Sequence, residues 1–186
     1  MPLAKEETYY TYADYLEWDE GVRCEIIDGE AFMMAPPTRM HQGISGELFV
    51  KIKNFLVGKP CKVYSAPFGV RLNPKKDNSD DTVLEPDISV ICDPSKLDDR
   101  GCNGAPDLVI EVLSPSTARH DRVVKFRKYQ EAGVREYWTV DPDTKSVQVF
   151  TLNDGQYIVS TYDDTDMAPI SVLPGCEIKL GDVFAE

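Results

Sequence analysis

Two short apolar segments, 88–92 and 108–113, constrain the fold of this chain more than any other feature of its sequence. Each directly follows a Pro-Asp pair, and each is rich in Ile, Val and Leu. Runs of this kind are typical of central strands that are covered on both faces by other layers. We therefore expect a β-sheet flanked by helices, with these two strands near its centre.

Two helices are predicted to cover the sheet. The first runs from a Thr38 cap to about Val57, and its apolar residues form one stripe: Ile44, Leu48, Ile52, Phe55 and Leu56. The second begins at Ser116 or Thr117 and ends at Gly133. Each helix is long enough to bury one face against a sheet.

The remaining pattern completes the predicted architecture. A helix is expected over 9–20, and strands over 22–27, 30–35, 61–66, 68–72, 134–140, 146–152 and 156–162. Segments 73–82 and 93–105 are predicted as loops, and the tail after Pro169 as irregular with one strand near Ile178. The fold class is thus α/β (α+β), a mixed β-sheet flanked by helices, with N-terminal and C-terminal β-hairpins.

Length and charge limit the functional classes. The 186 residues suit a single domain, 1–186, and no apolar run is long enough to span a membrane. Residues 1–10 lack the apolar core of a secretory signal, so none is expected. The net charge of −12 repels nucleic acid at long range. Any DNA-binding role must then use a local basic patch, a partner chain or a bound cation.

The five cysteines are odd in number, widely spaced and without a C-x-x-C pair. Neither a disulfide framework nor a structural zinc site is expected from them. Cys24, Cys61 and Cys92 have apolar neighbours and are predicted to be small buried hydrophobes. A reducing, cytoplasmic location follows as an expectation.

Glu111 is the most unusual residue, because it lies within the apolar run 108–113. Burying a carboxylate is costly unless a partner compensates it. One interpretation is a structural Glu that pairs with an Arg or Lys or faces a wetter side of the strand. The other is a metal ligand or catalytic group.

Asp87 is a candidate for the same site because of its position in the sequence relative to Glu111. A lone Pro-Asp often only opens a strand, as the second pair at Pro106-Asp107 illustrates. If the two strands are neighbours, however, Asp87 and Glu111 converge on one place in the sheet. Two carboxylates that meet repel each other, and a divalent cation such as Mg²⁺ relieves that repulsion.

Three further residues are candidates for the same site. Helical phase turns Lys125 toward the packed side of its helix, with Lys128 and Arg122 as rivals at the edge of that arc. The alternative for Lys125 is an aliphatic stem that covers apolar surface while its charge stays in water. His41 falls on the apolar stripe of the first helix, where a core histidine is the simpler interpretation. Glu25 alternates with apolar neighbours, and a solvated strand face is the simpler interpretation for it.

Taken together, these residues resemble the Uma-two family of restriction-endonuclease-like proteins, within the PD-(D/E)xK nuclease superfamily. The resemblance extends over roughly residues 9–160. The matching strings are Arg23-x-Glu25-Ile26-Ile27-Asp28-Gly29-Glu30, His41, Glu85-Pro86-Asp87, the segment 106–117, Asp121-x-x-x-Lys125-x-x-x-Tyr129, and Gly133-Val134-x-Glu136-Tyr137-Trp138-x-Val140-Asp141-Pro142.

The resemblance implies a restriction-endonuclease-like core with Asp87 and Glu111 as ligands of Mg²⁺ or Mn²⁺. The lysine of the wider superfamily's E-x-K motif would occupy position 113, which is Leu113 here. In this family the lysine is moved to the following helix, which selects Lys125 as the catalytic cation. The resemblance also places Glu25 and His41 near the site, beside the residues that would hold the metal, without fixing their roles.

The implied reaction is hydrolysis of a DNA phosphodiester bond by a metal-dependent endonuclease. The alternative is a non-catalytic interaction or scaffold protein that keeps the nuclease fold, which the acidic net charge favours. A basic rim around the site would favour DNA, and an acidic rim would favour the alternative. A homodimer is also expected, because Tyr137, Trp138 and the C-terminal hairpin add apolar surface and small oligomers are mostly C2 dimers.

Overall fold

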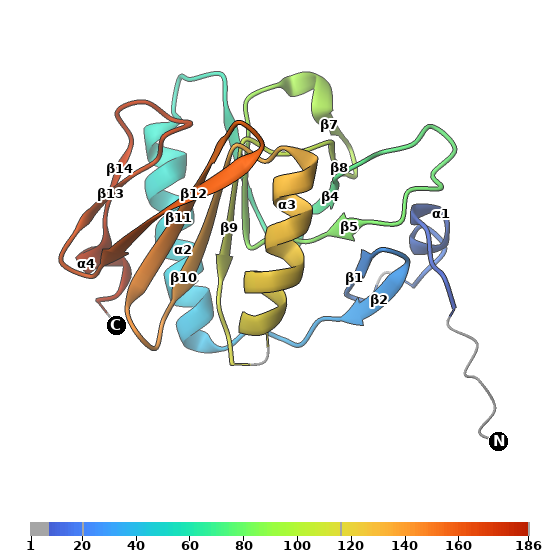
Figure 1. The fold of residues 1–186 in the computed structure, drawn as a ribbon, viewed down its shortest axis with the longest axis horizontal. Coiled ribbons are helices and arrows are strands. Elements are labelled where there is room, and N and C mark those ends of the chain that lie inside the picture. Colours follow the sequence, from blue (N-terminus) through green and yellow to red (C-terminus); the bar gives the residue numbers. More distant parts are fainter. Residues whose placement is uncertain (1–7, 20, 116, 186) are drawn as a thin grey trace.

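The structure is a computed structural model that describes residues 8–19, 21–115 and 117–185. Its centre is a six-stranded main sheet (Figure 1). The strand order of that sheet is β12 (Gln156–Asp163), β11 (Ser146–Asn153), β10 (Glu136–Asp141), β9 (Leu108–Val112), β6 (Ile88–Ile91) and β3 (Lys62–Ser65). Strands β9 and β10 are parallel and the other neighbours antiparallel, so the sheet is mixed, as predicted.

The two apolar segments are adjacent strands inside this sheet, as the sequence predicts. Every residue of β6 and β9 is buried, because helices cover both faces of the sheet. Helix α2 (Arg39–Phe55) lies on one face with Thr38 as its N-cap, and α3 (Phe126–Ala132) lies on the other (Figure 1). The stripe of α2 is buried at Ile44, Leu48, Ile52 and Leu56.

Helix α3 continues a longer helical segment, residues 118–132, that begins just after Thr117. Its middle part, His120–Lys125, is π-helical, and Gly133 ends the segment in the left-handed conformation (φ 82°) that glycine adopts without strain. Ser116, the other predicted cap, lies outside the described residues. We call this segment helix 118–132.

A second six-stranded sheet packs beside the first (Figure 1). Its order is β2 (Glu30–Met33), β1 (Cys24–Ile27), β5 (Val83–Leu84), β4 (Gly69–Arg71), β8 (Gly101–Asn103) and β7 (Leu97–Asp98). The β1–β2 hairpin turns at Asp28-Gly29, as predicted, and both turn residues have positive φ.

Three predictions of local structure are wrong. The helix expected over 9–20 is only α1 (Tyr12–Tyr15) in the described residues. The loop expected over 93–105 contains a 3₁₀ turn (Pro94–Lys96), β7 and β8, which are too short to carry a periodic pattern. The tail after Pro169 does contain the strand expected near Ile178, β14 (Glu177–Lys179), which pairs with β13 (Met167–Pro169). The expected irregular structure is wrong after that strand, where the chain forms α4 (Leu180–Val183), and these elements pack against α2.

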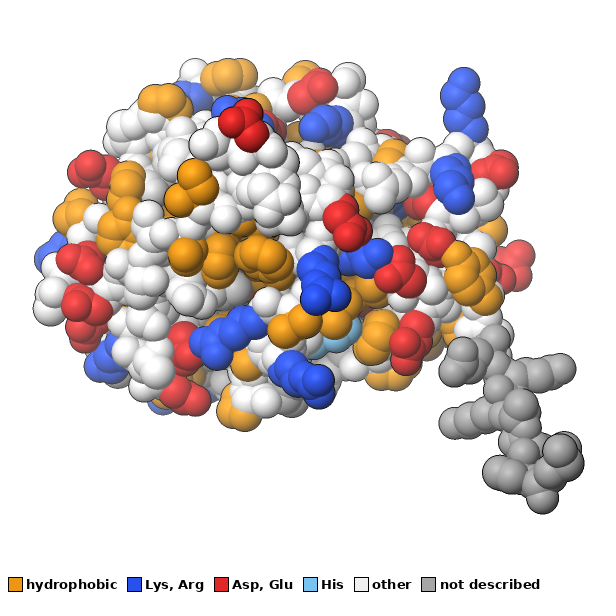
Figure 2. Space-filling view, viewed as in Figure 1, with side chains coloured by type: hydrophobic (Ala, Val, Ile, Leu, Met, Phe, Trp, Pro, Cys, Tyr) orange, Lys and Arg blue, Asp and Glu red, His pale blue; other side chains and the backbone are white. Residues whose placement is uncertain are grey.

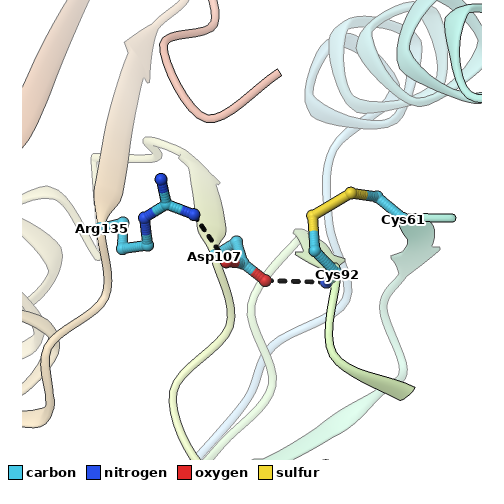
Figure 3. Close-up of a disulfide and its surroundings, with 4 residues drawn as sticks. All are labelled: Cys61, Cys92, Asp107 and Arg135. Atoms are coloured by element: carbon cyan, nitrogen blue, oxygen red, sulfur yellow. Dashed lines mark hydrogen bonds and ion pairs between the residues drawn. A yellow bond between two sulfur atoms is a disulfide. The ribbon is translucent and has the colours of Figure 1, made fainter. Parts of the chain in front are cut away.

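The cysteine prediction also fails at one pair, because Cys61 and Cys92 form a disulfide (Figure 3). The β3–β6 register pairs Lys62 with Ile91, so the two cysteines stand opposite each other just beyond the ladder. Both are half-buried, whereas Cys24, Cys102 and Cys176 are free and buried. Beside the disulfide, Asp107 accepts a hydrogen bond from the Cys92 N–H at 2.7 Å.

Among the described helices, none is long and apolar enough to cross a membrane.

Candidate active site

A cavity of about 530 Å³ opens where the two sheets meet. It is bordered by the β1–β2 hairpin, the start of α2, the ends of β6 and β9, and the first turns of helix 118–132. All five residues singled out by the sequence line it: Glu25, His41, Asp87, Glu111 and Lys125. The fold therefore gathers these candidates from five separate segments into one place.

Sheet register brings Asp87 and Glu111 together. Strands β6 and β9 pair Ile88 with Ile110, so the next position places Asp87 directly opposite Glu111. Opposite residues of an antiparallel pair project from the same face, with Cβ atoms about 4.5–5.5 Å apart. The Asp87 carboxylate also accepts a hydrogen bond from the Val112 N–H at 2.8 Å, which ties it to the end of β9.

Glu111 is compensated by two groups of helix 118–132. Its Oε1 accepts a hydrogen bond from the Tyr129 hydroxyl at 2.8 Å and lies 3.0 Å from the Lys125 Nζ. The interpretation of Glu111 as a buried carboxylate paired with a lysine is thus confirmed. The same carboxylate also lines the cavity beside Asp87, so its pairing with Lys125 does not remove it from the cavity.

Lys125 stands at the centre of three carboxylates. Its Nζ lies 2.8 Å from Glu25, 3.0 Å from Glu111 and 3.4 Å from Asp121. Lys125, Glu25 and Glu111 are each only 4% exposed, so the ion pairs are shielded from water. One ammonium thus serves three carboxylates, and the cluster keeps an excess of negative charge.

Burial, together with the crowding of carboxylates, perturbs the pKa values of the cluster. Burial raises the pKa of Glu111 well above its ordinary value; Lys125 opposes this, while the charges of Asp121, Asp87 and Glu25 add to it. Burial disfavours the charged form of Lys125, but the surrounding carboxylates raise its pKa well above its ordinary value. Lys125 is therefore charged at neutral pH, and an additional cation beside the carboxylates is electrostatically favourable.

His41 contacts Asp87 instead of lying in the core beneath α2. Its Nε2 is 3.1 Å from Asp87 Oδ2. Burial lowers the pKa of His41, but the hydrogen bond and the charge of Asp87 raise it, and the net pKa lies above its ordinary value. The simpler interpretation as a core histidine is thus wrong.

Glu25 differs in the same way from its simpler interpretation, a solvated strand face. All four residues of β1 are buried, because Ile26 packs against Tyr12 of α1 on one face and Ile27 packs in the cluster that contains Tyr129 of helix 118–132 on the other. The Glu25 carboxylate uses Oε1 to accept a hydrogen bond from the Glu85 N–H at 2.9 Å and to bind Lys125.

The structure separates the rival cations of helix 118–132. Lys128 points away from the cavity and pairs with Asp28 and Glu131, whose side chains are exposed. Arg122 is exposed and pairs with Asp141 at 2.7 Å. Of the three, only Lys125 lines the cavity, on the side that its helical phase predicts.

Two residues were not selected from the sequence, although both occur in the matched string Asp121-x-x-x-Lys125-x-x-x-Tyr129. Asp121 is buried and contacts Lys125, and burial raises its pKa. Tyr129 is buried and donates to Glu111. Their spacing of four residues on either side of Lys125 is the signal that would have found them, since residues four apart share a helix face.

The donor set fits a magnesium-type ion. Among the described residues no group of three or more His, Cys, Asp or Glu side chains is arranged to hold a metal. Mg²⁺ usually takes one or two carboxylates and completes its shell with water and substrate phosphate oxygens. Both described contacts of the Asp87 carboxylate use Oδ2, and both of Glu111 use Oε1, so each acid keeps a second hard oxygen for such an ion.

The rim of the cavity is neither basic nor acidic. Most of its exposed described lining residues are uncharged: Met33, Ala35, Pro36, Pro37, Thr38, Gln42, Pro115 and Thr117. The charged exception is Arg23, whose side chain is 38% exposed and is paired with Glu85. Basic side chains gather instead on the outer surface around helix 118–132 (Figure 2), where Arg119, Arg122 and Arg127 are exposed and Lys128 is half-buried. Arg122 and Lys128 are paired with carboxylates, so Arg119 and Arg127 are the residues that give this surface its positive charge.

Comparisons with known proteins place the chain in a family and identify its fold. Residues 12–181 match the model of the Uma2 family, described as "Putative restriction endonuclease". An uncharacterized protein of Synechocystis sp. is 31% identical over 157 residues, which cover 82% of this chain and 80% of that protein. The chain also resembles the crystal structure of a "putative nuclease belonging to DUF820" from Anabaena variabilis. The TM-score is 0.77 at 22% identity, over 95% of this chain and 98% of the other.

Proposed function

The chain belongs to the Uma2 family, and we propose that it is a divalent-metal-dependent endonuclease that hydrolyses phosphodiester bonds of DNA. The observation that carries the proposal is the placement of Asp87 opposite Glu111 at a cavity that Lys125 also lines. Two hard carboxylates and a buried ammonium are the groups that this hydrolysis requires. The restriction-endonuclease-like fold supports the same class of reaction.

Asp87 and Glu111 are proposed to hold Mg²⁺ or Mn²⁺. When bound there, the ion supplies Lewis-acid polarisation of the phosphate and lowers the pKa of a bound water. The chain's own residues position the ligands: the Val112 N–H and His41 hold the Asp87 carboxylate, and Tyr129 holds that of Glu111. Fixing both carboxylates in advance reduces the cost of ordering them around the ion.

Lys125 is proposed as the catalytic cation. Its ammonium has three hydrogens: two stay bound to Glu25 and Glu111, and the third exchanges its longer contact with Asp121 (3.4 Å) for a water or a phosphate oxygen. Glu25 and Asp121 act through Lys125, because each contacts it and keeps it charged. They are positioning residues in this scheme.

DNA is proposed to reach the cavity along helix 118–132. Arg119 and Arg127 are exposed there, and neither makes an ion pair with any residue that the structure describes. Contacts of Lys and Arg with phosphates supply most of the salt-dependent affinity for DNA. This basic surface answers the objection raised by the net charge of −12.

The decisive experiment compares two aspartates that follow prolines. Asp87→Asn is expected to abolish Mg²⁺- or Mn²⁺-dependent cleavage of single-stranded and duplex DNA. Asp107→Asn is the matched control, because Asp107 binds the Cys92 N–H and Arg135 outside the cavity. Wild-type protein without metal-dependent cleavage of any DNA form would refute the proposal and favour the non-catalytic scaffold.

A homodimer and a cytoplasmic location complete the proposal. Tyr137 and Trp138 are fully buried, so they add no apolar surface to the molecule. Strand β12, the edge of the main sheet, exposes Ile158 and Val159 instead, which gives a second copy an apolar edge to contact. Sedimentation velocity at micromolar concentration is expected to show a dimer, and a monomer alone would remove this part. The cytoplasmic location stays a prediction, and the Cys61–Cys92 bond weakens the cysteine argument for it.

A further inference from the structure

One wall of the cavity is not used by the proposed hydrolysis. It is formed by β2 and the segment after it, and its residues are apolar: Phe32, Met33, Met34, Ala35, Pro36 and Pro37. The carboxylates lie on the opposite side, on β1, β6, β9 and helix 118–132. The cavity has a volume of about 530 Å³, with apolar residues on one side and charged residues on the other. This size and this mixture of apolar and polar lining are typical of a small-molecule site.

Phe32 joins the two sides. The β1–β2 register pairs Phe32 with Glu25, so both side chains project from the same face of the hairpin. Glu25 in turn binds Lys125. The Phe32 ring packs against the ring of His120, with centroids 4.6 Å apart and planes inclined by 50°. An aromatic pair therefore stands directly beside the acidic cluster.

His120 adds an unused polar atom to this wall. Its Nε2 is buried and has no hydrogen-bond partner among the described residues, and the residue lines the cavity. Buried polar atoms nearly always have a partner, so an exception needs an explanation. Because Nε2 is shielded from solvent, a ligand supplies one by shifting the His120 ring, so that its polar edge meets Nε2 while its flat apolar face lies against the rings.

We propose that the Phe32–His120 wall binds the base of an unstacked nucleotide whose phosphate lies at Asp87 and Glu111. This inference rests on the proposed function and specifies its substrate. Within a duplex both faces of a base are covered by its neighbours, so a base against Phe32 must be single-stranded or extrahelical. The substrate class is therefore single-stranded DNA, or duplex DNA with an unpaired base.

The first test changes only the substrate. Wild-type protein with Mg²⁺ is titrated with a fluorescein-labelled oligothymidylate that carries nuclease-resistant phosphorothioate linkages, and with the same sugar-phosphate chain lacking its bases. Anisotropy is expected to show about 5- to 150-fold tighter binding of the base-bearing strand, the range for stacking of one base on an aromatic side chain. Equal affinities would overturn the inference without any variant protein.

The second test changes the ring. Phe32→Leu keeps an apolar side chain but removes the aromatic face, and it is expected to abolish the preference for the base-bearing strand while leaving the affinity for the base-free strand unchanged. Phe126→Leu is the matched control, because Phe126 is also half-buried but packs against Phe150 and Tyr157 outside the cavity. A Phe32→Leu protein that weakens both strands equally, or retains the preference, would refute the base site.

Cleavage assays keep this inference separate from the proposed function. Wild-type protein is expected to cut a single strand, or a duplex with one unpaired base, at least fivefold faster than a perfect duplex. Metal-dependent cleavage with no such preference would refute the base site but not the proposed endonuclease activity. A base preference in the binding assay without cleavage of any substrate would refute the proposed reaction but not the base site.

Discussion

Replacing Lys125 by methionine tests the buried cluster most directly. Methionine keeps much of the side-chain volume but removes the ammonium that pairs with Glu25, Glu111 and Asp121. Breaking a buried ion pair from one side costs about 3–5 kcal/mol, because the remaining charges are left uncompensated. For a chain of this size each kcal/mol lowers Tm by about 2–4 °C, so the expected decrease is about 6–20 °C.

The matched control lies one turn along the same helix. Lys128→Met removes a pair with the exposed Asp28, and surface pairs contribute about 0–1 kcal/mol. Thermal unfolding in EDTA is expected to show a large loss for Lys125→Met and almost none for Lys128→Met. Added Mg²⁺ is expected to raise the Tm of Lys125→Met more than that of wild type, since a like charge near the ligands is gone.

Activity completes this test. Lys125→Met is expected to lower single-turnover cleavage at least about a hundredfold even when Mg²⁺ restores the fold, because an oriented charge is lost from a buried site. Lys128→Met is expected to cleave at nearly the wild-type rate. A Lys125→Met protein with wild-type Tm would show that the buried cluster does not hold its charges as described, and full activity would show that the catalytic cation lies elsewhere.

Three further predictions address the metal site, the disulfide and a second buried pair. Mg²⁺ at a hundredfold excess over its Kd is expected to stabilise wild type by about 2.7 kcal/mol, and calorimetry should show most of this gain missing in Glu111→Gln. Reducing the Cys61–Cys92 bond opens a loop with a sequence separation of 31 residues, and urea unfolding should show a loss of at most about 4 kcal/mol. Burial raises the pKa of Asp80, but hydrogen bonds from Arg71 and a backbone N–H outweigh it, and the net pKa lies below the ordinary 3.8. Asp80 therefore stabilises the fold above pH 3.8, and this stabilisation is lost as the pH falls through the lowered pKa. Asp80→Asn should reduce the free energy of unfolding by about 1–3 kcal/mol at neutral pH. In urea titrations the reduction should become progressively smaller below pH 3.8.

Features with a strong local cause were predictable from the sequence. The apolar runs of β6 and β9 identify central strands, because only strands covered on both faces are apolar at consecutive positions. The α2 stripe and its Thr38 cap identify that helix and its buried face. Helical phase turns Lys125 inward for the same reason, since a period of 3.6 residues decides which side of a helix meets the core.

Other features depend on contacts between distant segments, and only the tertiary structure decided them. Cys61 meets Cys92 because of the β3–β6 register, which nothing near either cysteine encodes. The two- and three-residue strands β5, β7 and β8 have no pattern of their own and become strands by pairing with β1, β4 and each other. Glu25 is buried because its face of β1 packs against helix 118–132, and its carboxylate is stable there because Lys125, 100 residues further along the chain, supplies the opposite charge.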